Sequence, residues 1–143
     1  MGLMSILSLS TAGLGVERAR LEVSAANLAN AQTPVAAGQT GYEPLAVLVR
    51  STAMSELSGG TLESALPRPF VSEIVPMKTS PRRVYEPGHP DADAKGYVNY
   101  PGVDPVTTML DLITISRSYE ANLKAFDITR SLLQRTIDIG GQA

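Results

Sequence analysis

The fold is decided by residues 104–141, DPVTTMLDLITISRSYEANLKAFDITRSLLQRTIDIGG, close to the end of a chain of 143 residues. Asp104 is a favoured residue for the N-cap of a helix, and Pro105 is favoured at the first helical position. No other proline or glycine follows until Gly140, which with Gly141 supplies a C-terminal stop. The run therefore predicts one helix of roughly 50 Å, at about 1.5 Å per residue.

Apolar residues recur along this predicted helix at alternating spacings of three and four, the a/d pattern of a coiled coil. The positions of this pattern are Met109, Leu112, Ser116, Tyr119, Leu123, Phe126, Arg130, Leu133 and Ile137. Further apolar residues lie outside it: Leu110, Ile113, Ile128 and Leu132. The helix is therefore predicted to bury more than one face.

The N-terminal segment, to about Ala31, has the same character. One a/d pattern comprises Leu9, Ala12, Val16, Ala19, Val23, Ala26 and Asn30. A second row of leucines, about 200° round the helix from the first, comprises Leu7, Leu14, Leu21 and Leu28. A helix that is apolar on two sides must be covered on both. Because two helices that pair bury only one row each, we expect copies or relatives of the chain to cover the rest.

The segment between the helices contains most of the prolines and predicts a small β-rich domain. Short strands are expected in LAVLV (residues 45–49), FVSEIVPM (70–77) and RRVY (82–85), around a Ser/Gly-rich break. Residues 85–105, YEPGHPDADAKGYVNYPGVDP, are mostly turn-forming. The aromatic side chains expected to anchor this segment are Tyr85, Tyr97 and Tyr100.

The predicted fold class is therefore mainly α with a small β-rich insertion, its two long terminal helices forming a coiled-coil-like pair. We divide the chain into residues 1–41, the N-terminal helix and the following loop; residues 42–103, the middle domain; and residues 104–143, the C-terminal helix.

Composition argues against most chemistry. The net charge of −2 lacks the basic excess of a nucleic-acid binder, and the chain has no Cys and one His. His89, Asp91 and Asp93 resemble the start of a calcium loop, but Lys95 and Gly102 stand where oxygen ligands are needed. We therefore expect no enzyme, no cofactor, no metal, no nucleic acid and no small-molecule substrate.

Two further segments resemble a dinucleotide loop and a signal peptide or membrane span, but each lacks required features. Gly13-Leu14-Gly15 lacks the preceding strand and the third glycine of a dinucleotide loop, so a close approach of helices or a flexible point is the better interpretation. Residues 1–16 carry no charge, but the positive n-region of a signal peptide is missing, and serines and a threonine interrupt the apolar run. Neither a cleaved signal peptide nor a membrane span is expected.

Three runs resemble the axial protein family of the bacterial flagellum, which forms its rod and hook. SAANLANAQTP (residues 24–34) resembles the N-terminal signature of that family, and SRSYEANLKAFD (116–127) resembles its C-terminal signature. Residues 85–105 are similar to a segment typical of proximal-rod subunits. The chain departs from the family pattern in VAAGQTGYEPLAVLV (35–49).

The resemblance implies a structural subunit of the proximal rod, the drive shaft that transmits torque for motility. Its implied partners are copies of itself, other rod proteins, and inner-membrane ring and export-gate components at the rod base. The implied location is the part of the basal body that spans the periplasm, reached by flagellar type III export without a cleaved signal peptide. A helical adaptor that binds a partner helix, and a distal-rod or hook relative, are the alternatives.

The predicted assembly interface combines the apolar rows with polar residues that would fix register, as buried Asn does in coiled coils. It comprises Leu9, Leu14, Val16, Leu21, Val23, Asn27, Asn30, Leu112, Tyr119, Glu120, Asn122, Leu123, Phe126 and Leu133.

Overall fold

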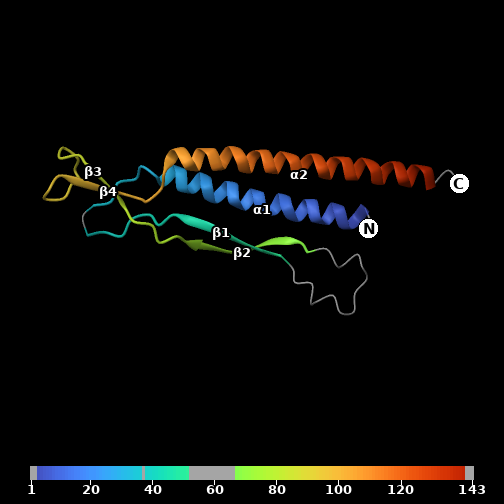
Figure 1. The fold of residues 1–143 in the computed structure, drawn as a ribbon, viewed down its shortest axis with the longest axis horizontal. Coiled ribbons are helices and arrows are strands. Elements are labelled where there is room, and N and C mark those ends of the chain that lie inside the picture. Colours follow the sequence, from blue (N-terminus) through green and yellow to red (C-terminus); the bar gives the residue numbers. More distant parts are fainter. Residues whose placement is uncertain (1–2, 37, 52–66, 141–143) are drawn as a thin grey trace. The chain divides into compact units, whose positions relative to one another are not determined.

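The computed structural model of the chain describes residues 3–36, 38–51 and 67–140. The elements follow one another as two helices separated by four short strands (Figure 1). Their bounds are α1 Leu3–Asn30, β1 Leu45–Ser51, β2 Pro69–Pro76, β3 Arg82–Tyr85, β4 Tyr97–Tyr100 and α2 Pro105–Gly140. The predicted fold class, mainly α with a small β insertion, is confirmed. The Ser/Gly-rich break lies outside the described residues.

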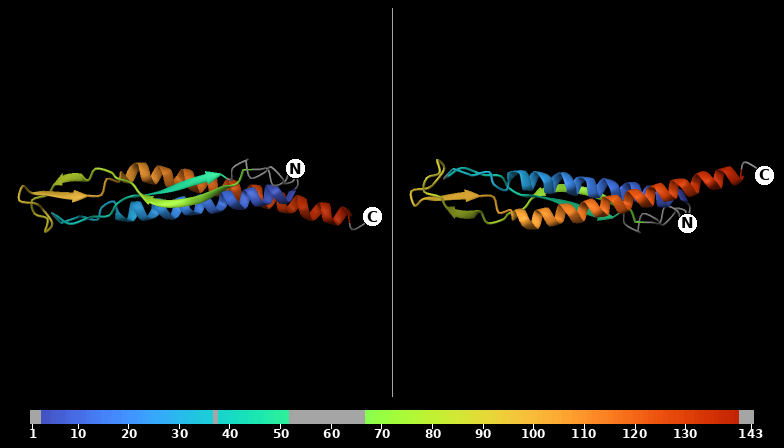
Figure 2. Two further views of the ribbon diagram at one scale, coloured as in Figure 1. Left: turned by 90° about the horizontal axis from the view of Figure 1, so that it is seen from below. Right: turned by 90° about the horizontal axis from the view of Figure 1, so that it is seen from above.

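Both helices begin and end where local chemistry predicts. The Asp104 carboxylate accepts hydrogen bonds from the backbone N–H groups of Val106 and Thr107, each at 3.3 Å, and so caps α2 at Pro105. α1 ends at Asn30, four residues before Pro34. Each helix is drawn as one uninterrupted coil in all views (Figures 1 and 2).

The strands form two separate two-stranded sheets, β1 with β2 and β3 with β4. β3 and β4 are antiparallel, with Arg82 opposite Tyr100 and Tyr85 opposite Tyr97. The backbone of Val35 extends this pairing through an isolated antiparallel bridge to Asn99. β1, β2 and β3 match the predicted strands, whereas β4 lies in a run that was interpreted as turns.

The described residues fall into two compact units, each built from distant parts of the sequence. Unit 1 takes its residues from Met1–Ala19, Leu48–Glu73 and Ile115–Ala143. Unit 2 takes its residues from Arg20–Val47 and Ile74–Thr114. The division therefore falls within α1, α2, β1 and β2.

The interiors of the two units differ in chemistry. In unit 2 the buried side chains are mainly apolar: Val23, Ala31, Val98 and Val103, with Asn27 among them. In unit 1 the buried side chains are Ser5, Ser10, Val16 and Thr129. Among the fully buried side chains of the described residues, unit 2 therefore has more apolar ones than unit 1.

The apolar rows of α1 are covered within a single chain. Val16 and Val23 are buried, and the leucines of the second row are half-buried. The side chains that remain exposed on α1 include Arg18 and Glu22. A single chain therefore covers this helix partly on both sides, and further cover by copies or relatives of the chain stays a prediction.

On α2 five of the nine residues of the predicted row are half-buried: Leu112, Ser116, Tyr119, Phe126 and Leu133. Between them the chain covers Ile115, Asn122 and Thr129, while Met109, Leu123, Arg130 and Ile137 are exposed. The prediction followed hydrophobicity, whereas small and polar side chains occupy the close approach.

Among the residues that the structure describes, neither helix has a stretch long and apolar enough to cross a membrane.

Candidate assembly surfaces

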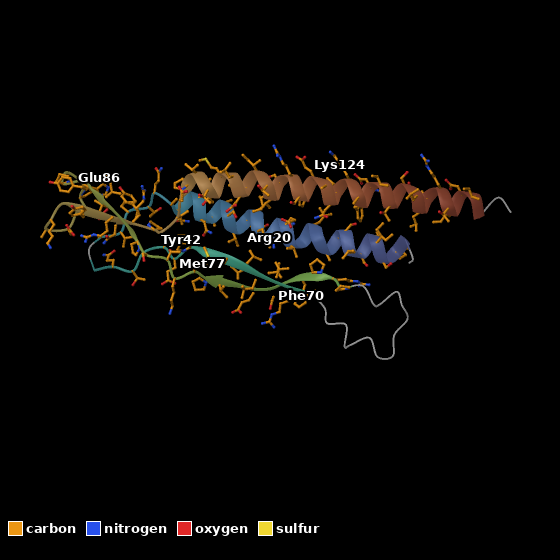
Figure 3. The ribbon with its side chains drawn as sticks, in the orientation of Figure 1. Arg20, Tyr42, Phe70, Met77, Glu86 and Lys124 are labelled. Carbon is orange, nitrogen blue, oxygen red and sulfur yellow. The ribbon has the colours of Figure 1, made fainter. Side chains whose placement is uncertain are left out.

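The largest exposed apolar side chains of α2 gather at its two ends. The early patch, in unit 2, consists of Val106, Met109, Leu110 and Ile113. The late patch, in unit 1, consists of Ile128, Leu132, Ile137 and Ile139. Between them α2 exposes charged side chains, among them Arg117, Glu120 and Lys124. Figure 3 shows the side chains along α2 and labels Lys124.

The early patch is the clearer of the two because its members share one helical face. Val106, Leu110 and Ile113 are spaced at i, i+4 and i+7, and Val106 and Leu110 expose 67% and 60% of their surface. Contiguous exposed apolar surface is uncommon on soluble monomers and marks interaction sites. Leu110 and Ile113 are among the apolar residues predicted to lie outside the a/d pattern, whereas Val106 is recognised only from its exposure in the structure.

The predicted interface residues divide by burial. Val16, Val23 and Asn27 are buried within the chain, while Glu120 and Leu123 are exposed. The others are half-buried: Leu9, Leu14, Leu21, Asn30, Leu112, Tyr119, Asn122, Phe126 and Leu133. A contact of any of these residues with another subunit stays a prediction.

Asn27 is engaged inside the chain. Its Nδ2 donates to the carbonyl of Leu45, and its Oδ1 accepts from the Leu45 N–H and the Tyr42 hydroxyl, each at 2.8 Å. Burial of the Tyr42 ring region raises the pKa of its hydroxyl above the ordinary value, which keeps it a donor. Asn27 thus ties α1 to the start of β1, a role that the sequence analysis did not foresee.

The loop that Asn27 holds also borders a hollow in unit 2. A cavity of about 310 Å³ is lined by residues 39–44, by Met77 and its neighbours, and by Asn99, Tyr100 and Gly102. Tyr42 and Met77 are close together in the side-chain view (Figure 3). The Met77 N–H donates to the Pro44 carbonyl at 2.6 Å, which joins the two walls.

The other polar residues of the predicted interface form a hydrogen bond within their own helix, lie at the contact between helices, or are exposed. Asn30 Nδ2 donates to the carbonyl of Ala26, one turn earlier in α1. Asn122 lies against Gly13 within unit 1: a Cβ on Gly13 would be 3.1 Å from Asn122 Nδ2. Glu120 is exposed on α2. The close-approach interpretation of Gly13 is therefore supported, with Asn122 as the side chain that uses the space.

Gly13 and Gly15 provide a matched pair of substitutions. Gly15→Ala meets no atom within 4 Å and should raise the free energy of unfolding by about 0.5–1 kcal/mol through helix propensity. Gly13→Ala has the same propensity gain but must displace Asn122, so we expect a net effect about 1 kcal/mol less favourable. Thermal unfolding followed by far-UV circular dichroism measures both. Equal stabilisation by the two substitutions would contradict the close contact.

Asp93 organises the turn between β3 and β4. Its Oδ1 accepts from the backbone N–H groups of Lys95 and Tyr97, and its Oδ2 pairs with Arg83 at 2.6 Å. The Arg83 guanidinium also lies over the Tyr97 ring, 4.9 Å from its centroid. Gly96 adopts a φ of +79°, which glycine tolerates without strain. Asp93 therefore acts as a turn residue whose carboxylate binds the backbone.

Two carboxylates of unit 2 predict a loss of stability in acid. The Tyr97 N–H bond chiefly holds the pKa of Asp93 below its ordinary value of 3.8, and the Thr107 hydroxyl chiefly does the same for the pKa of Asp104. Both groups therefore stabilise the fold above that value, and this stabilisation is lost as pH falls through their lowered pKa values. Urea unfolding midpoints should fall between pH 5 and pH 3, as measured by tyrosine fluorescence. The variant Asp93→Asn should be less stable at neutral pH and show a shallower fall; an unchanged slope would contradict the assignment.

Within the described residues, no group of three His, Cys, Asp or Glu side chains is placed to hold a metal ion. His89 Nδ1 accepts from the Asp91 N–H at 3.1 Å, as in a tight turn. The described residues present two exposed apolar patches on α2 and an ordered β3–β4 hairpin, which are surfaces suited to contact with other proteins.

Comparison with known proteins identifies the family. Residues 94–139 match the family described as "Flagellar basal body rod FlgEFG protein C-terminal", a range that covers β4 and nearly all of α2. The chain is 32% identical to the flagellar basal-body rod protein FlgC of Escherichia coli O6:H1 over 140 residues, 98% of this chain and 99% of that protein. It is 34% identical to the FlgC of Yersinia enterocolitica over the same shares.

A more distant bacterium gives the same result. The FlgC of Bacillus subtilis (strain 168) is 35% identical, and the match covers 94% of this chain and 95% of that protein. The match runs through both helices and the strands between them. The chain belongs to the family of flagellar basal-body rod proteins FlgC.

Proposed function

We propose that this chain, a structural subunit of the flagellar basal-body rod, is built into the rod through the exposed apolar patches of α2. The observation that carries the proposal is the early patch, four large aliphatic side chains exposed at the start of α2. Leaving such a surface in water costs roughly 25 cal/mol per Å² relative to burying it, so association with a partner is favoured.

The partners that fit these patches are copies of this chain and other rod proteins. α1 buries Val16 and Val23 and half-buries its second row of leucines, whereas α2 exposes whole apolar patches, so we assign the first contacts between subunits to α2. Residues of the predicted interface that are half-buried, such as Tyr119 and Phe126, would then position the helix that carries the patches. Contact with inner-membrane ring or export-gate components at the rod base remains part of the proposal.

The mechanical role follows from the arrangement of polar and apolar groups. A shaft that transmits torque needs subunits that do not slide along one another. Apolar patches separated by Arg117, Glu120 and Lys124 favour one register, because a shifted helix would bring charges onto apolar surface. We propose no catalytic role and no cofactor for any residue.

The wider setting is also proposed. We assign the chain to the part of the rod that crosses the periplasm, reached by flagellar type III export without a cleaved signal peptide. The resemblance of residues 24–34 and 116–127 to axial-protein signatures supports this assignment. We retain residues 1–41, 42–103 and 104–143 as the proposed functional division, with the outer two forming intersubunit contacts.

The proposal is tested by deleting the gene and examining basal bodies by electron microscopy, with a swimming assay beside it. We expect the rod and hook to be missing while the inner-membrane ring remains, and we expect the wild-type gene to restore both. Complete and rotating flagella in the deletion strain would overturn the rod assignment.

A further inference from the structure

A polar hollow beside the β3–β4 hairpin of unit 2 contains two opposite charges. The hollow, of about 280 Å³, is lined by Gln32, Arg82, Val84, Glu86 and Tyr100. Arg82 begins β3 and Glu86 follows its end, and their even spacing places both on one side of the strand. Neither side chain makes an ion pair with any other residue that the structure describes.

Glu86 is fixed in place by hydrogen bonds that leave its charge without a cation. Its N–H donates to the carbonyl of Gly96 at 2.8 Å, and its own carbonyl accepts from the His89 N–H at 3.0 Å. Its Oε2 accepts from the Tyr100 hydroxyl at 3.0 Å, and the residue is half-buried. Because a neutral hydroxyl does not balance a carboxylate, this partly desolvated group gains from a cation that another molecule supplies.

Arg82 is the positive group of the polar hollow. Its guanidinium lies over the Tyr100 ring, 5.3 Å from the ring centroid, and the residue is exposed. Arg83, on the other side of β3, is by contrast paired with Asp93. The polar hollow therefore presents one positive and one negative group to a partner outside the chain.

α2 carries exposed charges that match these two groups. They alternate in sign at spacings of three and four and form what we call the charged row: Arg117, Glu120, Lys124 and Asp127. Arg117 and Lys124 come two positions after the covered residues Ile115 and Asn122, which is about 200° round the helix. Within the described part of the chain, no member of the charged row makes an ion pair. Figure 3 labels Glu86 near the hairpin and Lys124 on α2.

We propose that the charged row of one copy of this chain docks on the polar hollow of a second copy. An acidic side chain of the row meets Arg82, and a basic side chain of the row meets Glu86. The contact is head-to-tail because it joins two different surfaces, and head-to-tail contacts build rings or open helical assemblies. The inference deepens the proposed function and rests on it, since rod assembly is the setting in which two copies meet.

Charge inversion on one or both surfaces tests the contact in cells that lack the gene. The hollow inversion combines Arg82→Glu with Glu86→Arg. The row inversion combines Arg117→Glu, Glu120→Arg, Lys124→Glu and Asp127→Lys. Neither inversion changes the net charge of the chain. We expect either inversion alone to lower the number of complete rods at least about tenfold, because like charges then face each other. A chain with both inversions should restore rods and swimming.

Every result of this experiment decides the question. Wild-type numbers of rods from either single inversion would overturn the contact, and such rods from the row inversion would also follow if the row paired with itself. A folded chain with both inversions that still builds no rods would mean that the charges meet a different protein. In both cases the rod function stands, because the deletion strain and the wild-type gene test it separately.

Two variants separate the charge of Glu86 from its hydrogen bond. Glu86→Gln keeps an acceptor for the Tyr100 hydroxyl and loses the charge, whereas Tyr100→Phe loses the hydrogen bond and keeps the charge. We expect Glu86→Gln to lower the number of rods with an unchanged unfolding midpoint, and Tyr100→Phe to build rods normally. The opposite pattern would assign Glu86 to the fold of the hairpin and overturn the proposal.

A matched pair on α2 tests the charged row in the same way. Lys124→Glu reverses a charge in the row, and Arg130→Glu makes the same change at an exposed position about 120° round the helix. We expect Lys124→Glu to impair assembly and Arg130→Glu to be tolerated. Equal behaviour of the two variants would contradict a specific role for the row.

Cross-linking keeps every charge in place and so remains valid if an inverted chain fails to fold. The chain has no cysteine, and Gln32 beside the hollow and Ala121 beside Glu120 are both exposed. In basal bodies from cells that make Gln32→Cys and Ala121→Cys chains together, a short bismaleimide linker should join two copies. Basal bodies that contain only one of these variants should yield no joined copies. Absence of joined copies from the mixed basal bodies, or equal amounts in all three samples, would overturn the proposal.

Discussion

Ile113→Asp is expected to abolish rod assembly while the isolated subunit stays folded. Ile113 belongs to the early patch and exposes 52% of its surface, so a charge there is solvated in the free chain. In a contact between subunits the same carboxylate would be buried without a partner, at a cost of at least about 3 kcal/mol. That cost weakens association by more than about a hundredfold.

The measurement is a complementation assay in cells that lack the gene. The variant gene should fail to restore swimming, and electron microscopy should show inner-membrane rings without rods. The purified variant should keep the far-UV circular dichroism and the unfolding midpoint of the wild type, because exposed substitutions change stability by about 0.5 kcal/mol or less.

The neighbouring residue provides the control. Thr114 is exposed on α2 and donates its hydroxyl to the carbonyl of Leu110, one turn earlier. Thr114→Asp places the same charge one residue further along and about 100° round the helix, away from Ile113. We expect it to restore swimming. Equal failure of both variants would show only a general intolerance of negative charge, and restoration by both would remove the early patch from the interface.

Exposed positions make a sharper test than the residues of the predicted rows. Leu21 and Phe126 are half-buried within the chain, so a charge at either would disturb the subunit itself. In the late patch, Ile128→Asp can be compared with Gln134→Asp, because both residues are exposed and lie about 120° apart round the helix. Loss of assembly confined to Ile128→Asp would extend the interface along α2.

The sequence predicted the features that local chemistry controls. The cap at Asp104 and the proline after it place the start of α2, because both act within one turn of the chain. β1 and β2 have alternating or continuous apolar residues that a short window detects. β4 was not predicted because its four residues lie among turn-forming neighbours. Its strand conformation depends on pairing with β3, which a short sequence window does not reveal.

The features that depend on distant contacts were not predictable in the same way. An a/d pattern fixes every seventh residue of a row but leaves two choices for the position between. Hydrophobicity favoured Met109 and Leu123, whereas the chain covers Asn122, because Gly13 gives it room. The hydrogen bonds of Asn27 could not be predicted, because their partners Tyr42 and Leu45 are distant in sequence and no recognisable motif marks them.

Gly102→Ala is expected to cause a large loss of stability. A Cβ at this position would lie 2.5 Å from the Ser80 carbonyl oxygen and 2.6 Å from the Thr79 hydroxyl oxygen. A backbone oxygen cannot rotate away as a long side chain can, so the strand connection must shift. Overpacking of this kind costs about 1–3 kcal/mol.

Gly88→Ala is the matched control, because it lies in the same run of turns and its added Cβ meets nothing within 4 Å. It should be neutral, or stabilising by up to about 1 kcal/mol through the unfolded chain. Urea unfolding followed by tyrosine fluorescence compares the two, since the chain has no tryptophan and Tyr97 and Tyr100 lie on β4. Equal midpoints would mean that the approach of residues 79–80 to Gly102 is looser than the structure shows. A lowered midpoint for Gly102→Ala alone would show that the contact between the β2–β3 connection and the β4–α2 connection helps to hold unit 2 together.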